Sequence, residues 1–203
     1  MDEIRLFADY HTHTQYRNPR VRVEAHMRVA QRAGLTEVGI TDHGPNTIGT
    51  RALAATAKMS LGKNGGIRLL EQVRDAVFEI RRRGAAYAGG AQKVTPLAGV
   101  EANVIGEDGE LDVPSAFLES LDIVLVGLHQ WVVPRSIGGS LYFGPLGAAL
   151  GRTRVFRHKA RTIYTKAVVE AVLKNRIDIV THPGLGFDID TLELARACAK
   201  MGT

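Results

Sequence analysis

The sequence offers little from which a disulfide framework, a membrane span or a base-stacking surface could be built. Cys198 is its single cysteine, so disulfides cannot hold the fold and a thiolate-rich zinc site is excluded. No apolar run reaches the length of a membrane-spanning helix, and the acidic start lacks the basic-then-apolar pattern of a signal peptide. We therefore expect a cytoplasmic protein with no membrane partner.

The rest of the composition is that of an ordinary globular chain. Hydrophobic residues make up 45% and charged residues 23% of 203 residues, which is enough for one buried core. We expect residues 1–203 to form a single domain.

Acidic residues are missing from one long stretch, between Asp122 and Glu170. The chain carries a formal net charge of +5, and this stretch contains Arg135, Arg152, Arg154, Arg157, Lys159, Arg161 and Lys166. Both a solvated basic face and a surface for phosphate or nucleic acid explain such a pattern. Aromatic residues are only 6% of the chain and Trp131 is its one tryptophan, so nucleic acid is the less favoured partner.

Apolar runs of strand length alternate with helical patterns. The runs are Ile4–Tyr10, Glu37–Thr41, Leu97–Val100, Ile123–Leu128 and Ile177–Thr181. Apolar stripes predict helices around Val23–Ala30, Ile67–Ile80, Ser115–Ser120, Ile163–Val172 and Thr191–Lys200. This alternation predicts parallel βα units, with a glycine-rich loop at 138–151.

Metal-binding residue types follow each apolar run. They are His11, His13, His43, Glu101, His129 and His182. The carboxyl ends of the strands of a βα barrel converge on one mouth, so we expect these side chains to meet. His11 and His13 are two apart on a strand and point to the same face.

Imidazole and carboxylate ligands without thiolate suit zinc, manganese or iron. Five histidines and one glutamate exceed the four ligands of a single zinc, so two or three ions sharing Glu101 are expected. Such centres activate water and stabilise the charge of a phosphoryl group.

The segments DYHTHT, ITDHG, GVEANV, VGLH and THPG, in this order, resemble the motifs of the PHP (polymerase and histidinol phosphatase) family, in its branch of small stand-alone hydrolases. The resemblance implies an α/β fold, a distorted (β/α)7 TIM-like barrel, with a trinuclear zinc or manganese/iron centre that hydrolyses phosphate esters.

The resemblance also implies roles for individual residues. His11 and His13 would bind a first metal, Glu101 would bridge to a second that His129 and His182 complete, and His43 would belong to a third. Asp42 is expected to orient a histidine. Apart from the resemblance, Arg135 is expected to assist phosphate binding, because the acid-free stretch lies between His129 and His182 and its loop should emerge at the mouth of the barrel. These two are the expected catalytic residues besides the metal ligands.

Two departures from the family pattern stand out. A third histidine shortly after the H-x-H is replaced by the segment Gln15–Arg20, where Arg17 and Arg20 offer positive charge. The family closes its barrel with two more strands and an Asp-x-His, whereas this chain stops at Thr203. The expectation is a barrel truncated after its fifth βα unit, with an open edge that favours oligomers.

The leading hypothesis is a metal-dependent hydrolase of small phosphomonoesters. A nuclease-like phosphodiesterase or a phosphotyrosine phosphatase keeps the chemistry and changes the substrate. A non-catalytic metal-binding or regulatory module is the alternative of another class, favoured by the two departures.

Overall fold

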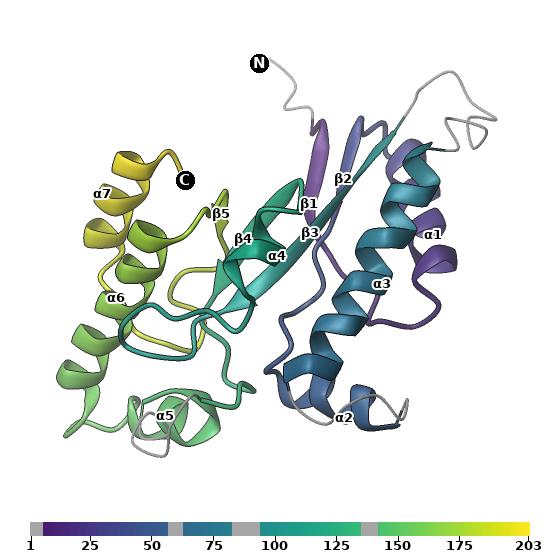
Figure 1. Cartoon of the computed structure of the whole chain (residues 1–203). Coiled ribbons are helices and arrows are strands. Elements are labelled where there is room, and N and C mark those ends of the chain that lie inside the picture. Colours follow the sequence, from purple (N-terminus) through teal and green to yellow (C-terminus); the bar gives the residue numbers. More distant parts are fainter. Residues whose placement is uncertain (1–5, 57–62, 83–93, 135–141) are drawn as a thin grey trace.

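Strands and helices alternate along the chain, as the apolar pattern predicts (Figure 1). The computed structural model describes residues 6–56, 63–82, 94–134 and 142–203. Its strands are β1 (Ala8–Thr12), β2 (Glu37–Ile40), β3 (Thr95–Asn103), β4 (Ile123–Gly127) and β5 (Ile179–Val180). Its helices are α1 (Pro19–Arg32), α2 (Ile48–Thr56), α3 (Lys63–Arg82), α4 (Ser115–Leu118), α5 (Gly144–Leu150), α6 (Arg157–Lys174) and α7 (Thr191–Met201).

The strands form one curled parallel sheet in the order β1-β2-β3-β4-β5. Because every strand runs in the same direction, all the carboxyl ends lie at one side of the sheet, where α2 and α5 are also found (Figure 1). Within the described residues, β1 and β5 are the edge strands. The predicted α/β class is confirmed, because the curled sheet corresponds to successive units of a TIM-like barrel.

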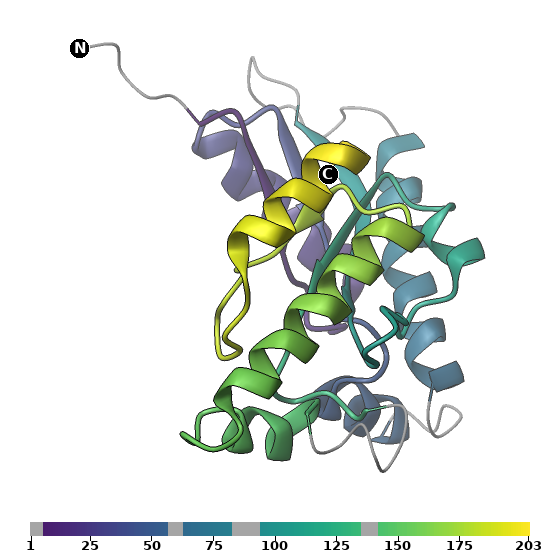
Figure 2. The same ribbon diagram turned by 90° about the vertical axis from the view of Figure 1, so that its left-hand side faces the viewer.

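Helices cover the sheet from outside the curl. The stripe that predicts a helix over Ile67–Ile80 forms α3, whose Leu70, Val73 and Val77 are buried against the sheet. At the other end of the sheet, α6 packs on α7 (Figure 2) and contributes buried Val168 and Val172 to the same core. None of the helices described is both long and apolar enough to cross a membrane.

Two strands are longer at their carboxyl ends than predicted. β1 runs to Thr12, whose carbonyl accepts a hydrogen bond from the Thr41 amide at 2.8 Å. β3 runs to Asn103, and the Glu101 amide donates to the Asp42 carbonyl at 3.0 Å. His11 and Glu101 therefore lie within strands rather than after them, because polar side chains facing the site do not interrupt the backbone pairing.

Part of the glycine-rich segment is helical rather than a loop. Gly144–Leu150 forms α5, with a proline in its first turn. Proline is favoured at the start of a helix because its fixed φ suits that position, and the Ala148–Leu150 run favours helix after it. The rest of the segment, up to residue 141, lies outside the described residues.

Gly39 in β2 lies against the backbone of β1, so we expect Gly39→Ala to destabilise the fold. A Cβ there would lie 2.7 Å from the Tyr10 carbonyl oxygen and 2.9 Å from Tyr10 Cα. The free energy of unfolding in a urea titration should fall by about 1–3 kcal/mol, the usual cost of overpacking. Gly49→Ala in α2 is the control, because a Cβ there has no neighbour within 4 Å. Equal loss of stability in the two variants would contradict this packing.

Candidate metal centre

A fully buried carboxylate, that of Glu101, forms the centre of the predicted site. Its two oxygens face imidazole nitrogens from four other segments of the chain. The distances to Oε2 are 3.0 Å from His11 Nε2, 2.9 Å from His43 Nδ1 and 3.6 Å from His13 Nε2. The distances to Oε1 are 3.1 Å from His129 Nε2 and 2.9 Å from His182 Nε2. The convergence that the strand-end pattern predicts is present.

The parallel sheet explains this convergence. His43 forms a parallel bridge with Glu101, which places the end of β2 directly beside β3. His182 follows the short strand β5 with a φ of 29°. Left-handed backbone at a non-glycine residue costs on the order of 1–3 kcal/mol and is typical of functional sites. The fold thus holds a strained residue where it turns an imidazole toward Glu101.

The ligand-type atoms form two groups that share Glu101. One group is His11, Glu101 and His182, and the other is His13, His43 and Glu101; within each, the ligand atoms lie within 4.8 Å of one another. The ring of His11 lies near both His13 and His182, with centroids 5.0 Å and 5.7 Å away, so the expected pairing of His11 with His13 stays a prediction. His13 lies beyond the end of β1, where its ring also stacks on His43 with centroids 4.5 Å apart.

A buried hydrogen-bond chain fixes the ring of His129. The Asn103 amide nitrogen Nδ2 donates to Asp112 Oδ2 at 2.5 Å, so the amide oxygen Oδ1 faces His129 Nδ1 at 2.7 Å. An amide oxygen only accepts, so Nδ1 carries the proton and neutral His129 points the lone pair of Nε2 at Glu101. Two acceptors facing each other are stable when His129 is protonated or when a cation lies between them.

Several buried polar atoms at the site lack partners. Among the described residues, Glu101 Oε2, His13 Nδ1 and His43 Nδ1 have no partner in hydrogen-bond geometry, although His43 Nδ1 is only 2.9 Å from Glu101 Oε2. Unpaired buried polar groups are costly, and the facing lone pairs of Glu101 Oε2 and His43 Nδ1 are what a divalent cation requires. The donor set therefore fits metal binding by nitrogen and carboxylate ligands.

Burial and charge shift the titration of these groups. Burial, together with the neighbouring His43, lowers the pKa of His13 to about 4. Burial would raise the pKa of Glu101, but the imidazoles of His129 and His43 beside the carboxylate outweigh it and hold that pKa well below its ordinary value. At neutral pH the centre therefore presents an ionised carboxylate and an uncharged His13, which are the protonation states that bind metals.

Asp42, which was expected to orient a histidine, contacts the segment after His13 instead. It is buried, and it accepts hydrogen bonds from Thr14 Oγ1 at 2.6 Å and from the Gln15 amide at 2.8 Å. Burial raises the pKa of Asp42 against the effect of these two bonds. Within the described residues, the hydrogen bonds of its side chain thus hold the segment that follows His13, rather than an imidazole ring.

Some supporting residues were not predicted from the sequence. Thr181 Oγ1 donates to Glu101 Oε1 at 2.8 Å, and His26 Nε2 lies 3.1 Å from the His13 carbonyl oxygen. Asn103 had a signal, because it lies two residues from Glu101 on the same strand. Asp112 had none, since a turn separates it from β3. Arg135, the predicted phosphate ligand, lies outside the described residues.

The segment that replaces the family's third histidine makes a tight turn. Gln15, Tyr16 and Asn18 have φ values of 56°, 56° and 44°. Arg20 forms ion pairs with Glu24 and Glu79, whereas Arg17 lines a cavity beside His13 and His43.

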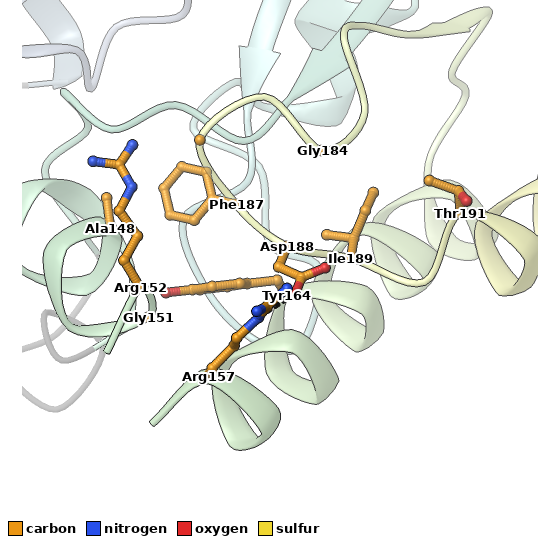
Figure 3. A pocket seen from close by; sticks show the side chains of 11 residues that line it. Ala148, Gly151, Arg152, Arg157, Tyr164, Gly184, Phe187, Asp188, Ile189 and Thr191 are labelled. Atoms are coloured by element: carbon orange, nitrogen blue, oxygen red, sulfur yellow. Dashed lines mark hydrogen bonds and ion pairs between the residues drawn. The ribbon is translucent and has the colours of Figure 1, made fainter. Parts of the chain in front are cut away.

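The acid-free stretch is partly neutralised in space. Arg157 Nε lies 3.0 Å from Asp188 Oδ2, and Arg161 Nη2 lies 3.1 Å from Asp190 Oδ2. Arg152 and Arg157 line a cavity of about 630 Å³ between α5, α6 and the loop before α7. Figure 3 shows Asp188 beside Arg157 at this cavity. The acids come from the segment after β5, so the sequence stretch is basic while the surface it forms is of mixed charge.

Comparison with known proteins agrees with this geometry. The profile of the PHP domain matches residues 9–191. Probable phosphatase Sbal195_1503 of Shewanella baltica strain OS195 is 29% identical over 196 residues, which cover 96% of this chain and 58% of the relative. Probable phosphatase Sputw3181_2734 of Shewanella sp. strain W3-18-1 is 28% identical over 196 residues, covering 96% of this chain and 59% of the relative.

The chain thus spans less than three fifths of the length of these curated relatives. The profile match, in contrast, covers most of the chain and begins in the strand that carries His11. On that extent of similarity, this chain belongs to the PHP domain family.

Proposed function

We propose that the protein is a metal-dependent phosphoesterase that hydrolyses small phosphomonoesters at the His/Glu centre. The observation that carries the proposal is the buried Glu101 carboxylate, whose oxygens face five imidazoles while Oε2 has no hydrogen-bond partner among the described residues. The names of the curated relatives, probable phosphatases, support the same chemistry.

The two groups that share Glu101 would hold the ions, with His129 added on the side of Oε1. Zinc suits these ligands, and manganese or iron are alternatives. When bound, such cations activate water and place positive charge beside the phosphoryl group. Within the protein, Glu101 supplies the negative charge that attracts cations, Asn103 keeps the Nε2 lone pair of His129 directed at the site, and Asp42 holds the turn after His13.

A small substrate is favoured over a nucleic acid. A strong electrostatic footprint for a polyanion requires unpaired cations along a surface. Two of the predicted cations, Arg157 and Arg161, are paired with Asp188 and Asp190. The phosphodiesterase alternative predicts DNA binding that weakens steeply with salt, and the regulatory alternative predicts metal binding without turnover.

Removal of metal tests the proposal directly. The protein should hydrolyse a simple aryl phosphate, lose that activity on dialysis against a chelator and regain it when zinc or manganese is added. The loss should be at least about a hundredfold, since several kcal/mol of charge stabilisation disappear. Activity that persists in the metal-free protein would contradict the proposal. Metal binding with no turnover would favour the regulatory module.

Replacing the Glu101 carboxylate tests whether it is a metal ligand. Glu101→Gln removes the negative charge shared by both groups, so we expect a lower metal-to-protein ratio and turnover reduced by about a hundredfold or more. Elemental analysis and aryl phosphate hydrolysis measure the two effects. Glu119→Gln is the matched control, because that carboxylate is exposed at the end of α4. Arg135→Ala should have the smaller effect, since its role would be limited to binding.

Asn103 should act through His129 rather than on the substrate. Asn103→Leu keeps the approximate volume and removes the acceptor for His129 Nδ1, so the ring loses its fixed tautomer. Metal affinity should fall by about 10–100-fold, the usual effect of losing such a supporting hydrogen bond. Competition with a metal-binding dye measures it, and the unfolding temperature of the metal-free protein controls for packing. Unchanged affinity would show that His129 is not a ligand.

A further inference from the structure

A second cavity lies directly beside the metal centre, on the side of α2. It measures about 480 Å³ and is lined by His13 and His43 from the centre and by the segment Gln15–Arg17. The remaining lining consists of Asp42 and of small or apolar residues at and before α2: Thr47, Gly49, Thr50, Ala52 and Leu53. Its volume falls within the range of about 300–1,000 Å³ that is typical of small-molecule sites.

Arg17 is the one cation among the described lining residues. Within the described parts of the chain, its guanidinium makes no hydrogen bond or ion pair. Arg20, three residues on, is committed to Glu24 and Glu79. Of the two arginines in the segment that replaces the family's third histidine, Arg17 is thus the one whose donors are available beside His13 and His43.

The other charged residue of the lining does not compete for Arg17. Asp42 Oδ2 accepts from Thr14 Oγ1 and Asp42 Oδ1 from the Gln15 amide, so both oxygens already have donors. A guanidinium donates two parallel hydrogen bonds to a phosphate, which suits it to hold the phosphoryl oxygens that face away from the metals. One cation matches one phosphate group.

The α2 side of the cavity has no charged side chain among the described lining residues. Its threonine hydroxyls are used locally, since Thr47 Oγ1 and Thr50 Oγ1 lie 2.7 Å apart and Thr47 Oγ1 also accepts from the Thr50 amide. A second phosphate or a carboxylate on the substrate would find no further cation among the described lining residues. The chemistry of this side suits an uncharged alcohol or aryl group.

We propose that this cavity is the substrate site: Arg17 binds the phosphate of a monoester, and the α2 side receives its uncharged leaving group. The proposal rests on the phosphoesterase function proposed for the centre. It adds the residue that binds the phosphate and the class of ester that is hydrolysed. Hydrolysis breaks the bond between phosphorus and the ester oxygen, and water supplies the oxygen that phosphorus gains and the proton that the alcohol takes.

Loss of Arg17 tests the phosphate half of the proposal. Arg17→Met should raise the Ki of inorganic phosphate as a competitive inhibitor, and the KM for p-nitrophenyl phosphate, by roughly tenfold to a hundredfold, the effect of losing hydrogen bonds to a charged group. Arg17→Lys should recover part of the loss, since it keeps the charge without the fork. Metal content should not change. Arg22→Met, which removes an exposed cation of α1, is the control.

Filling the cavity tests the leaving-group half. Gly49 lines the cavity, and a Cβ there meets no atom within 4 Å, so we expect the larger side chain of Gly49→Leu to extend into the cavity rather than into the core. We expect the KM for p-nitrophenyl phosphate to rise about tenfold while the Ki of inorganic phosphate stays unchanged, because phosphate alone needs no leaving-group space.

The outcomes are distinguishable from failure of the proposed function. If the metal-loaded wild-type protein hydrolyses no phosphomonoester, the phosphoesterase function fails, and the substrate assignment fails with it. If the wild type is active but Arg17→Met matches Arg22→Met in Ki, the assignment of Arg17 is overturned. If Gly49→Leu leaves the KM for the aryl ester unchanged, or raises the Ki of phosphate equally, the leaving group does not lie on the α2 side.

Discussion

The burial of a single ionised carboxylate is the constraint on which this structure depends. Glu101 lies in the middle of the sheet with no exposed surface, a position where a lone charge is far more costly than any neutral side chain. The cost is offset only because the ends of four other strands bring imidazoles to within about hydrogen-bond distance of its oxygens. The sheet therefore has to curl, since a flat sheet would leave the outer histidines too far from β3.

The supporting contacts extend outward from this charge. Asp112 orients the Asn103 amide, which orients His129. On the opposite side, Asp42 holds the turn after His13, and the Tyr16 hydroxyl donates to the His43 carbonyl. Both arrangements use a buried acidic or amide group to fix a ring or a backbone segment, so that ligand atoms are positioned before any cation arrives.

The sequence could predict the residues of the centre because parallel strands impose a simple rule on their carboxyl ends. It could not predict the grouping of His11 with His182, which depends on the curl of the sheet and on where β1 ends. The role of Asp112 could not be predicted for a related reason: the pairing that brings it to Asn103 is set by a turn and not by a periodic pattern. The acid-free stretch was misleading because Asp188 and Asp190, which neutralise its arginines, come from beyond β5. Linear charge patterns do not report contacts between distant segments.

Two histidines that face the same carboxylate come from opposite ends of the strand order in the described residues. His11 lies on β1 and His182 follows β5, and both reach the same carboxylate on the central strand. A cation held by this group would link β1 to the end of β5 through β3. Such a link closes a loop of chain from His11 to His182, and so restricts the unfolded ensemble far more than a contact between neighbours does. The centre would then set the curvature of the sheet as well as its chemistry.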